Sequence, residues 1–142
     1  MGKLIRVVIV DDLESERELL EMALRNLGGF EIVAQLEDGK NALAYLKGEG
    51  TFGDRSKYPV PDVLFLDVKM PQVDGFDVLE FVRNELSGDH PLMLVFTASD
   101  DPGDRQRALQ LGADEFYTKP TGMADTIQLL KAFRDGFWKR QG

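Results

Sequence analysis

Residues 62–75 of the chain read DVLFLDVKMPQVDG, a short apolar run that ends in a carboxylate. Four consecutive apolar residues, from Val63 to Leu66, are typical of a buried strand. Asp67 follows at once, and after a turn Asp74 opens a segment whose apolar residues recur at helical spacing. The stretch therefore predicts a buried strand, an acidic turn and a helix.

The same alternation of strand and helix runs along the whole chain. The predicted strands are Leu4 to Val10, Phe30 to Leu36, Asp62 to Leu66, Pro91 to Phe96 and Glu115 to Thr118. The predicted helices are Leu13 to Leu27 with a Ser15–Glu18 capping box, Asp38 to Leu46, Asp74 to Leu86, a fourth that Asp101 caps and Gly112 ends, and Met123 to Lys139. Strict alternation of five such pairs predicts an α/β fold, a doubly wound five-stranded parallel sheet with helices on both faces.

The composition excludes several classes of protein. The chain has 142 residues, enough for one domain with a hydrophobic core. Its net charge of −8 leaves no basic surplus to neutralise phosphates, so we expect no nucleic-acid partner. Cysteine is absent, which excludes disulfides and thiolate chemistry. No run of about 18 apolar residues occurs, so we expect no membrane segment and a cytoplasmic protein.

In an open α/β sheet, ligands bind beyond the carboxyl ends of the strands. Taken singly, an aspartate at such an end is usually a cap or turn residue, and a lysine a solvated charge. Here, however, polar residues follow four of the five predicted strands. They are Asp11 and Asp12 after the first strand, Asp67 after the third, Thr97-Ala98-Ser99 after the fourth and Lys119-Pro120 after the fifth. We interpret this joint placement as one functional site.

Three carboxylates packed together repel one another, and a bound divalent cation would remove the conflict. Ligands that are all oxygen favour Mg²⁺, which keeps waters that phosphate oxygens can replace. An aspartate such as Asp67 can then attack a phosphoryl group. The Lys119 ammonium and the Thr97 hydroxyl can neutralise charge on the transferred group. The pattern therefore predicts phosphoryl transfer with a divalent metal.

The chain resembles the receiver domains of response regulators, of the chemotaxis-type fold, over essentially its whole length. The matching stretches are residues 7–12 (VVIVDD), 64–71 (LFLDVKMP) with Asp74-Gly75, 96–98 (FTA), and 112–114 (GAD) leading to Lys119-Pro120. The resemblance implies a flavodoxin-like three-layer sandwich. It also implies that residues 1–142 form a single receiver domain, which we expect to lack an output domain.

The resemblance also implies a role for each matching residue. Asp67 would be the phosphoacceptor of a two-component phosphorelay, and the protein would signal by changing shape rather than act as an enzyme beyond its own phosphorylation and dephosphorylation. Mg²⁺ or Mn²⁺ would be held by Asp11, Asp12, Asp67 and the backbone carbonyl of Lys69. The phosphoryl group would contact Thr97, Ala98 and Lys119, and Thr97 and Phe116 would be the switch residues. The Lys119–Pro120 bond would be cis.

The expected partners are a sensor histidine kinase or phosphotransfer protein, an unknown output protein and a second copy of the chain. Apolar residues near the end of the chain exceed what one helix stripe needs, so we expect some of them in a homodimer interface. The candidates are Tyr117, Leu129, Phe133 and Trp138. The long stretch from Gly48 to Pro61 is similar to that of single-domain regulators that partner bacterial phytochrome kinases.

Three alternatives remain open at this point. A phosphatase of the haloacid-dehalogenase type also uses an Asp nucleophile and Mg²⁺, but Lys69 stands where its second aspartate would be. A flavodoxin-like electron carrier needs a loop after the first strand that cradles a phosphate, which Asp11-Asp12 would repel without a metal. A degenerate receiver would keep the fold and lose phosphorylation, against which the intact acidic and lysine positions argue.

Overall fold

The computed structural model describes residues 3–86 and 90–141, which form one five-stranded parallel sheet in the order β2-β1-β3-β4-β5. The strands are β1 (Ile5–Val10), β2 (Phe30–Leu36), β3 (Val63–Leu66), β4 (Leu92–Thr97) and β5 (Glu115–Thr118). The helices are α1 (Glu14–Leu27), α2 (Gly39–Lys47), α3 (Gly75–Glu85), α4 (Pro102–Gln110) and α5 (Met123–Gln141), with a short 3₁₀ helix, η1, at Gly50–Gly53. The predicted fold class is confirmed.

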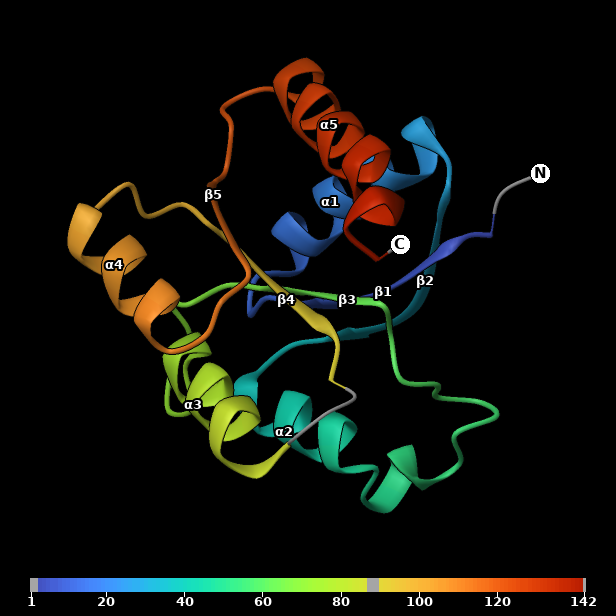
Figure 1. The fold of residues 1–142 in the computed structure, drawn as a ribbon, viewed down its shortest axis with the longest axis vertical. Helices are drawn as coiled ribbons and strands as arrows, with labels where there is room; N and C mark the ends of the chain where they lie inside the picture. The colour runs from blue at the N-terminus through green and yellow to red at the C-terminus, as the bar shows by residue number, and fades with distance from the viewer. Residues whose placement is uncertain (1–2, 87–89, 142) are drawn as a thin grey trace.

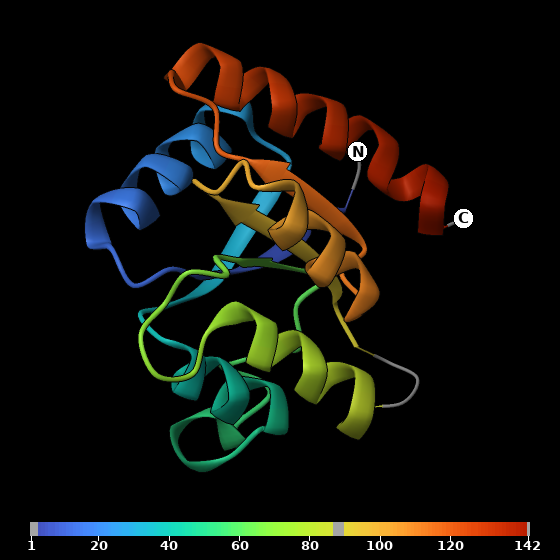
Figure 2. The same cartoon turned by 90° about the vertical axis from the view of Figure 1, so that its left-hand side faces the viewer.

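Helices cover both faces of the sheet (Figures 1 and 2). α1 and α5 lie together on one face, and α2 and α3 lie on the other. Alternate residues of each central strand point to opposite faces, so each strand feeds two separate cores. In β3, Val63 and Phe65 pack toward α1 and α5, whereas Leu64 and Leu66 pack toward α2 and α3. The continuous apolar runs of the sequence are therefore the mark of strands buried on both sides.

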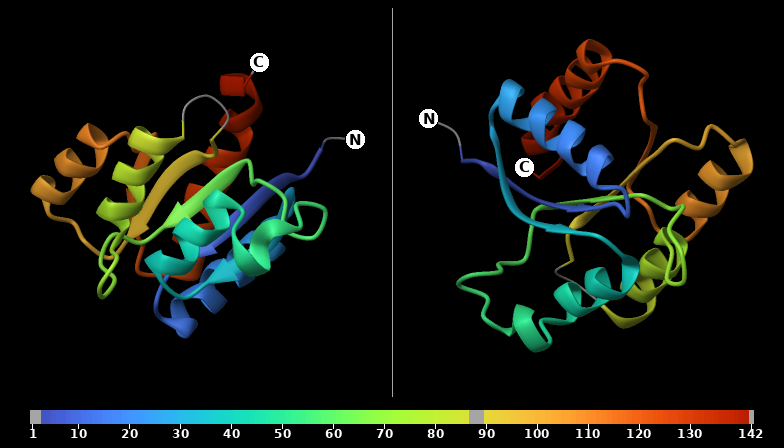
Figure 3. Two further views of the ribbon diagram at one scale, coloured as in Figure 1. Left: turned by 90° about the horizontal axis from the view of Figure 1, so that it is seen from below. Right: turned by 180° about the vertical axis from the view of Figure 1, so that it is seen from behind.

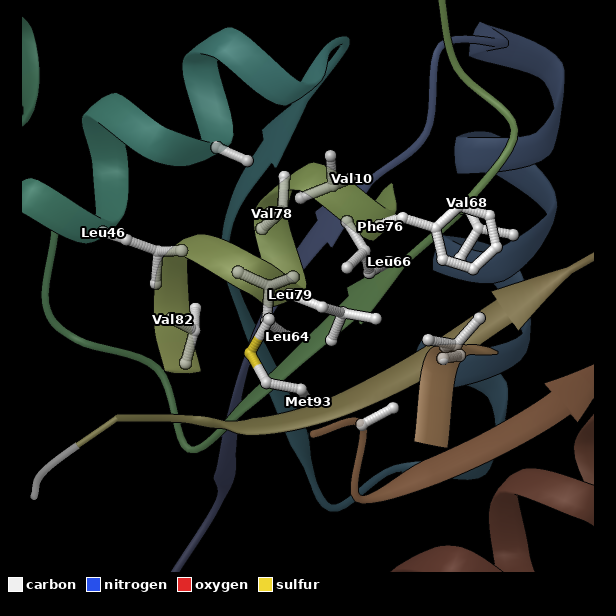
Figure 4. Close-up of a cluster of buried hydrophobic side chains, with 14 of the residues drawn as sticks. Val10, Leu46, Leu64, Leu66, Val68, Phe76, Val78, Leu79, Val82 and Met93 are labelled. Atoms are coloured by element: carbon white, nitrogen blue, oxygen red, sulfur yellow. The ribbon is translucent and has the colours of Figure 1, made fainter. Parts of the chain in front are cut away.

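Figure 4 shows the core on the side of α2 and α3. Phe76, Val78, Leu79 and Val82 of α3 project onto the sheet, where Leu64 is completely buried beneath them. This packing fixes α3 against β3 and thereby fixes the turn that joins them.

The long connection from α2 to β3 is ordered by aromatic packing. The rings of Tyr45, Phe52 and Tyr58 contact one another, with centroids between 5.0 and 6.1 Å apart. The Tyr45 hydroxyl also donates to the carbonyl of Pro59 at 2.7 Å. Figure 3 shows this segment, with η1, projecting beside α2 on the opposite side from α4. The connection from α2 to β3 therefore adds to the hydrophobic core on the side of α2.

One interface candidate in α5 was wrong. Leu130, Phe133 and Phe137 form the stripe that packs on the sheet, and Phe133 is only 2% exposed. Its ring lies 6.2 Å from that of Phe65 and 5.8 Å from that of Phe137. Phe133 is thus a core residue and not part of an exposed face.

The other candidates are less deeply buried. Tyr117 and Leu129 are partly buried against the same core, and Trp138 is 40% exposed. The Trp138 ring packs edge-on against Phe137, and the Lys3 ammonium lies 6.0 Å from its centre. Trp138 is therefore close to the beginning of the described chain, not to α4.

The Ser15–Glu18 capping box was also wrong. Leu13 occupies the N-cap of α1, and no side chain caps the helix there. The Leu13 amide instead donates to Asp11 Oδ1 at 3.0 Å. The helix begins at Glu14, so Ser15 already lies inside it and cannot be its N-cap. In the described parts of the chain, no helix has both the length and the apolar character that crossing a bilayer requires.

Candidate functional site

Four of the strands bring polar residues to one edge of the sheet. Asp11 follows β1, Asp67 follows β3, Thr97 ends β4 and Lys119 follows β5. Because α1 and α3 lie on opposite faces, the gap between β1 and β3 is the topological switch point where α/β folds bind ligands. The site predicted from the strand ends is therefore assembled at this point.

The turn after β3 holds Asp67 in a fixed orientation. The Lys69 amide donates to Asp67 Oδ1 at 3.0 Å, so the chain turns back over the carboxylate. Asp74 then caps α3, with a reciprocal capping box to Asp77. Only glycine fits at position 75, because a Cβ there would lie 2.4 Å from the Asp67 carbonyl oxygen. The Asp74-Gly75 pair therefore lets α3 begin directly against the end of β3.

Asp67 is a buried carboxylate, with a residue exposure of 6%. Burial raises the pKa of the Asp67 carboxyl above its ordinary value, and the charge of Asp11 adds to the rise. The Lys69 amide, the Thr97 hydroxyl and the Lys119 ammonium act in the opposite direction and only partly offset the effect of burial on this pKa. The ionised form of Asp67 is therefore disfavoured in the folded protein, and a bound cation would stabilise it.

Asp11, Asp12 and Asp67 form an acidic cluster. One carboxylate oxygen from each residue lies within 4.8 Å of the other two. This set of hard oxygen donors fits a divalent cation such as Mg²⁺ or Mn²⁺. The metal role of the Lys69 carbonyl stays a prediction.

Lys119 lies within the acidic cluster, and its side chain is 12% exposed. Its Nζ is 2.7 Å from Asp11 Oδ2, 3.0 Å from Glu16 Oε1 and 3.6 Å from Asp67 Oδ2. Burial alone would lower the pKa of the Lys119 ammonium, but the hydrogen bonds and charges of Asp11, Glu16 and Asp67 outweigh burial and raise it. Lys119 is therefore a permanent positive charge beside Asp67.

Thr97 is fully buried, and its hydroxyl donates to Asp67 Oδ1 at 2.7 Å. Ala98, next along the chain, is exposed at the rim of the site, so its expected phosphoryl contact stays a prediction. The Lys119–Pro120 bond is not cis, because none of the described peptide bonds is cis. This part of the expectation was wrong.

Phe116, the expected switch aromatic, is a buried residue of β5 in this structure. The Arg105 guanidinium of α4 lies 5.9 Å from its ring centre and donates to the Phe116 carbonyl at 3.1 Å. These contacts join β5 to α4 and hold the Phe116 ring in one buried position. The switch role of Phe116 therefore stays a prediction.

Two acidic residues of the site were missed by the reasoning from sequence. Glu16 contacts Lys119 from the first turn of α1. Asp104, in the first turn of α4, accepts from the Ser99 hydroxyl at 2.6 Å and pairs with the Lys69 ammonium at 3.1 Å. Hydrogen bonds from Ser99 and Lys69 hold the pKa of the Asp104 carboxyl below its usual value. Both residues lie on helices, so a search of strand ends alone could not find them.

Comparison with known proteins places this site in a family. The family model for the response regulator receiver domain matches residues 7–131. The transcriptional regulatory protein TrcR of Mycobacterium tuberculosis is 36% identical over 130 residues, which cover 92% of this chain and 45% of TrcR. Response regulator PleD of Caulobacter vibrioides is 35% identical over 129 residues, which cover 91% of this chain and 25% of PleD.

Among solved structures, the phosphorylated cyanobacterial phytochrome response regulator RcpA superposes with a TM-score of 0.80 at 25% identity. The match covers 98% of this chain and 96% of RcpA. This chain spans only 25% of the length of PleD and 45% of the length of TrcR. The matched family model nevertheless covers every residue of the site and most of both cores. The chain belongs to the response regulator receiver domain family.

Proposed function

We propose that Asp67 accepts a phosphoryl group from a phosphohistidine of a sensor histidine kinase or phosphotransfer protein. The observation that carries the proposal is the asymmetric setting of its carboxylate. Oδ1 accepts hydrogen bonds from the Lys69 amide and the Thr97 hydroxyl, whereas Oδ2 is directed at the Lys119 ammonium, 3.6 Å away. Oδ2 is therefore the oxygen placed to attack, with a cation ready for the charge that arrives.

In the proposed step, the bond between Asp67 Oδ2 and phosphorus forms as the bond between the histidine nitrogen and phosphorus breaks. The imidazole nitrogen keeps the electron pair of the broken bond and is protonated from solvent. Lys119 and the Thr97 hydroxyl bind the phosphoryl oxygens, and the backbone at Lys69 and Ala98 borders the same space. A divalent cation held by Asp11, Asp12 and Asp67 would supply the positive charge that an anion needs in this acidic cluster.

Mg²⁺ is the ion that we propose, since the donor set is all oxygen and the incoming group is a phosphate. We further propose that the chain acts as a phosphoacceptor that turns over only its own phosphoryl group. The rival phosphatase of the haloacid-dehalogenase type is not favoured, because the residue two positions after Asp67 is Lys69, whose ammonium pairs with Asp104. Lys69 cannot replace a carboxylic acid in that mechanism.

A phosphotransfer panel tests this function. Histidine kinases encoded by the same genome would be autophosphorylated with labelled ATP and mixed with the protein for short times. We expect label to leave one kinase and appear on this chain when Mg²⁺ is present, and to stay on the kinase when Asp67→Asn replaces the wild type. A chain that accepts label from no kinase, or that hydrolyses phosphate esters with many turnovers, would contradict the proposal.

The similarity to RcpA supports a finer proposal for the source of the phosphoryl group. RcpA is a phytochrome response regulator, and at 25% identity it matches 98% of this chain. We propose that the cognate kinase belongs to the bacterial phytochrome class. Transfer from such a kinase, at least as fast as from the other kinases of the panel, is the result expected.

We also propose that a second copy of the chain binds at the face made by α4, β5 and α5. Leu109 of α4 is 41% exposed, and Tyr117 of β5 and Leu129 of α5 are each only partly buried. Sedimentation of the wild type and of Leu109→Glu, each with and without phosphodonor, tests this. We expect a dimer that phosphorylation tightens and that the substitution weakens, and a monomer in every state would reject the proposal.

A further inference from the structure

The Lys119 ammonium is not centred on Asp67. It makes its two short contacts with Asp11 at 2.7 Å and Glu16 at 3.0 Å, and its distance to Asp67 Oδ2 is 3.6 Å. An ammonium has three N–H donors in a tetrahedral arrangement, so two short partners on one side orient it toward that side. We call this the resting position of Lys119, in which the ammonium lies closer to Asp11 and Glu16 than to the acceptor.

We propose that Glu16 is a positioning residue that holds the Lys119 ammonium in this resting position and thereby opposes phosphorylation of Asp67. The inference rests on the proposed function, because it concerns the cation that would bind the phosphoryl group. It assigns to Glu16 a role that neither its position on α1 nor the motifs of the chain imply. Glu16 and the phosphoryl group compete for one ammonium.

Glu16, rather than Asp11, is the partner able to give way. The side chain of Asp11 is 7% exposed, and its Oδ1 accepts the Leu13 amide at 3.0 Å. The side chain of Glu16 is 32% exposed, at the start of α1. If Lys119 left Asp11 while no metal was bound, a carboxylate would remain buried without a cation, which is costly. If Lys119 left Glu16, that carboxylate would turn into water.

The surroundings of Glu16 allow this movement. Glu16 and Lys119 both line a cavity of about 130 Å³ between α1 and α5, with Leu19, Pro120 and Met123 on its walls. Water-sized space beside the ion pair means that the glutamate side chain can change rotamer without displacing the core. The cost of releasing Lys119 is then the ion pair itself and not a rearrangement of the two helices.

Phosphorylation supplies the force that would move Lys119. A phosphoryl group carries between about −1.5 and −2 charges at neutral pH, so it attracts the ammonium more strongly than a single carboxylate does. The contact with Glu16 exists only while the ammonium is in its resting position, so it stabilises the unphosphorylated state selectively. Removing the Glu16 charge should therefore favour the phosphorylated state.

A double-mutant cycle between Glu16 and Lys119 tests the inference. The wild type, Glu16→Gln, Lys119→Met and the double variant would be labelled with acetyl phosphate at saturating Mg²⁺, and initial rates read by intact mass. In the presence of Lys119, we expect Glu16→Gln to raise the rate about 1.5-fold to fivefold, the range that a partly exposed ion pair can contribute. In the Lys119→Met background, the same substitution should change nothing.

Two further variants separate the contact from general charge effects. Glu18→Gln removes the same charge from an exposed position of α1 and should label at the wild-type rate. Glu16→Asp keeps the charge but is one methylene shorter, so its rate should lie between those of the wild type and Glu16→Gln. Thermal unfolding of each variant shows that the fold is retained.

The outcomes are distinguishable. A Glu16→Gln protein that labels no faster than a normally labelling wild type would overturn the inference, and so would an equal gain in Glu18→Gln or a gain that persists without Lys119. A wild type that takes up no label at all would instead overturn the proposed function, and this inference with it.

Discussion

Replacing Asp67 with asparagine should stabilise the fold at neutral pH without metal, although it removes the proposed acceptor. Asparagine keeps an oxygen that can accept from the Lys69 amide and the Thr97 hydroxyl, so both hydrogen bonds to Oδ1 survive. What is lost is the negative charge of a buried carboxylate. Because that charge is a cost to the folded state, we expect the free energy of unfolding to rise.

The distances in the site give the size of the effect. Coulomb's law at an effective dielectric constant of about 20 gives ~3.5 kcal/mol of repulsion from each of Asp11 and Asp12, whose oxygens lie within 4.8 Å. The attraction of Lys119 at 3.6 Å offsets this repulsion by ~4.6 kcal/mol. The substitution therefore relieves ~2 kcal/mol before screening by water and salt, and we expect a measured gain of ~1–2 kcal/mol.

The gain should depend on pH with a definite sign. The pKa of Asp67 is raised in the folded state, so its charge destabilises the wild type above this pKa. As the pH falls through the raised pKa, folded Asp67 takes up a proton and the penalty shrinks. Below the ordinary carboxyl pKa of about 3.9, folded and unfolded chains are both protonated there, and the advantage of Asp67→Asn should be gone.

Metal should reverse the order of the two proteins. A ligand that binds only the folded state stabilises it by ~2.7 kcal/mol at a concentration 100 times its dissociation constant. We expect Mg²⁺ to give the wild type this gain and Asp67→Asn much less of it, since one of three carboxylates is missing.

Urea unfolding, followed by far-ultraviolet circular dichroism between about pH 3 and 8 with and without Mg²⁺, measures these effects. Asp100→Asn, an exposed aspartate on the loop after β4, is the matched control and should change the unfolding free energy little. An Asp67→Asn protein that is less stable than the wild type at pH 7 in chelator would refute the reasoning. An equal rise in the unfolding free energy of Asp100→Asn would mean that the effect comes from the net charge of the protein and not from the site.

Three other substitutions probe separate parts of the site and core. Asp12→Asn should weaken Mg²⁺ binding in calorimetry and slow phosphorylation, and labelling at full rate in chelator would contradict the metal model. Lys119→Met should still accept phosphate, slowly, but should not show the spectroscopic change of the phosphorylated wild type, so an unchanged response would reject its role in transmission. Phe133→Ala should cost ~3–5 kcal/mol of stability as a core aromatic, whereas Trp138→Ala should cost ~1 kcal/mol or less; equal losses in urea unfolding would contradict the assigned burial.

The fold and the acidic site could be predicted from sequence for one physical reason. Parallel strands bring their carboxyl ends to the same edge, so residues far apart in sequence, such as Asp11, Asp67 and Lys119, meet without any knowledge of side-chain packing. The apolar runs identify the strands because both faces of the sheet are covered. The start of the helix at Asp74 could be predicted for a different reason. A helix cap and a close backbone approach allow few residue types, such as Asp74 and Gly75 here.

Two of the failures concern the rotation of helices about their own axes. Helical spacing defines stripes but does not say which stripe faces the sheet, so Phe133 was assigned to the surface although Leu130, Phe133 and Phe137 recur at the spacing of one face. The contact of Glu16 with Lys119 was missed for the same reason, because it depends on how α1 is turned after Leu13. Residues at helix starts near the predicted strand ends are the signal that could have found it.

The central claim is that Asp67 is the residue that accepts the phosphoryl group, with a divalent cation present. Intact mass of the protein after incubation with acetyl phosphate and Mg²⁺, followed by peptide mapping, tests it most directly. We predict the addition of one phosphoryl group, located at Asp67, absent in chelator and absent from Asp67→Asn. A phosphoryl group mapped to another residue, or equal labelling of Asp67→Asn, would contradict the account.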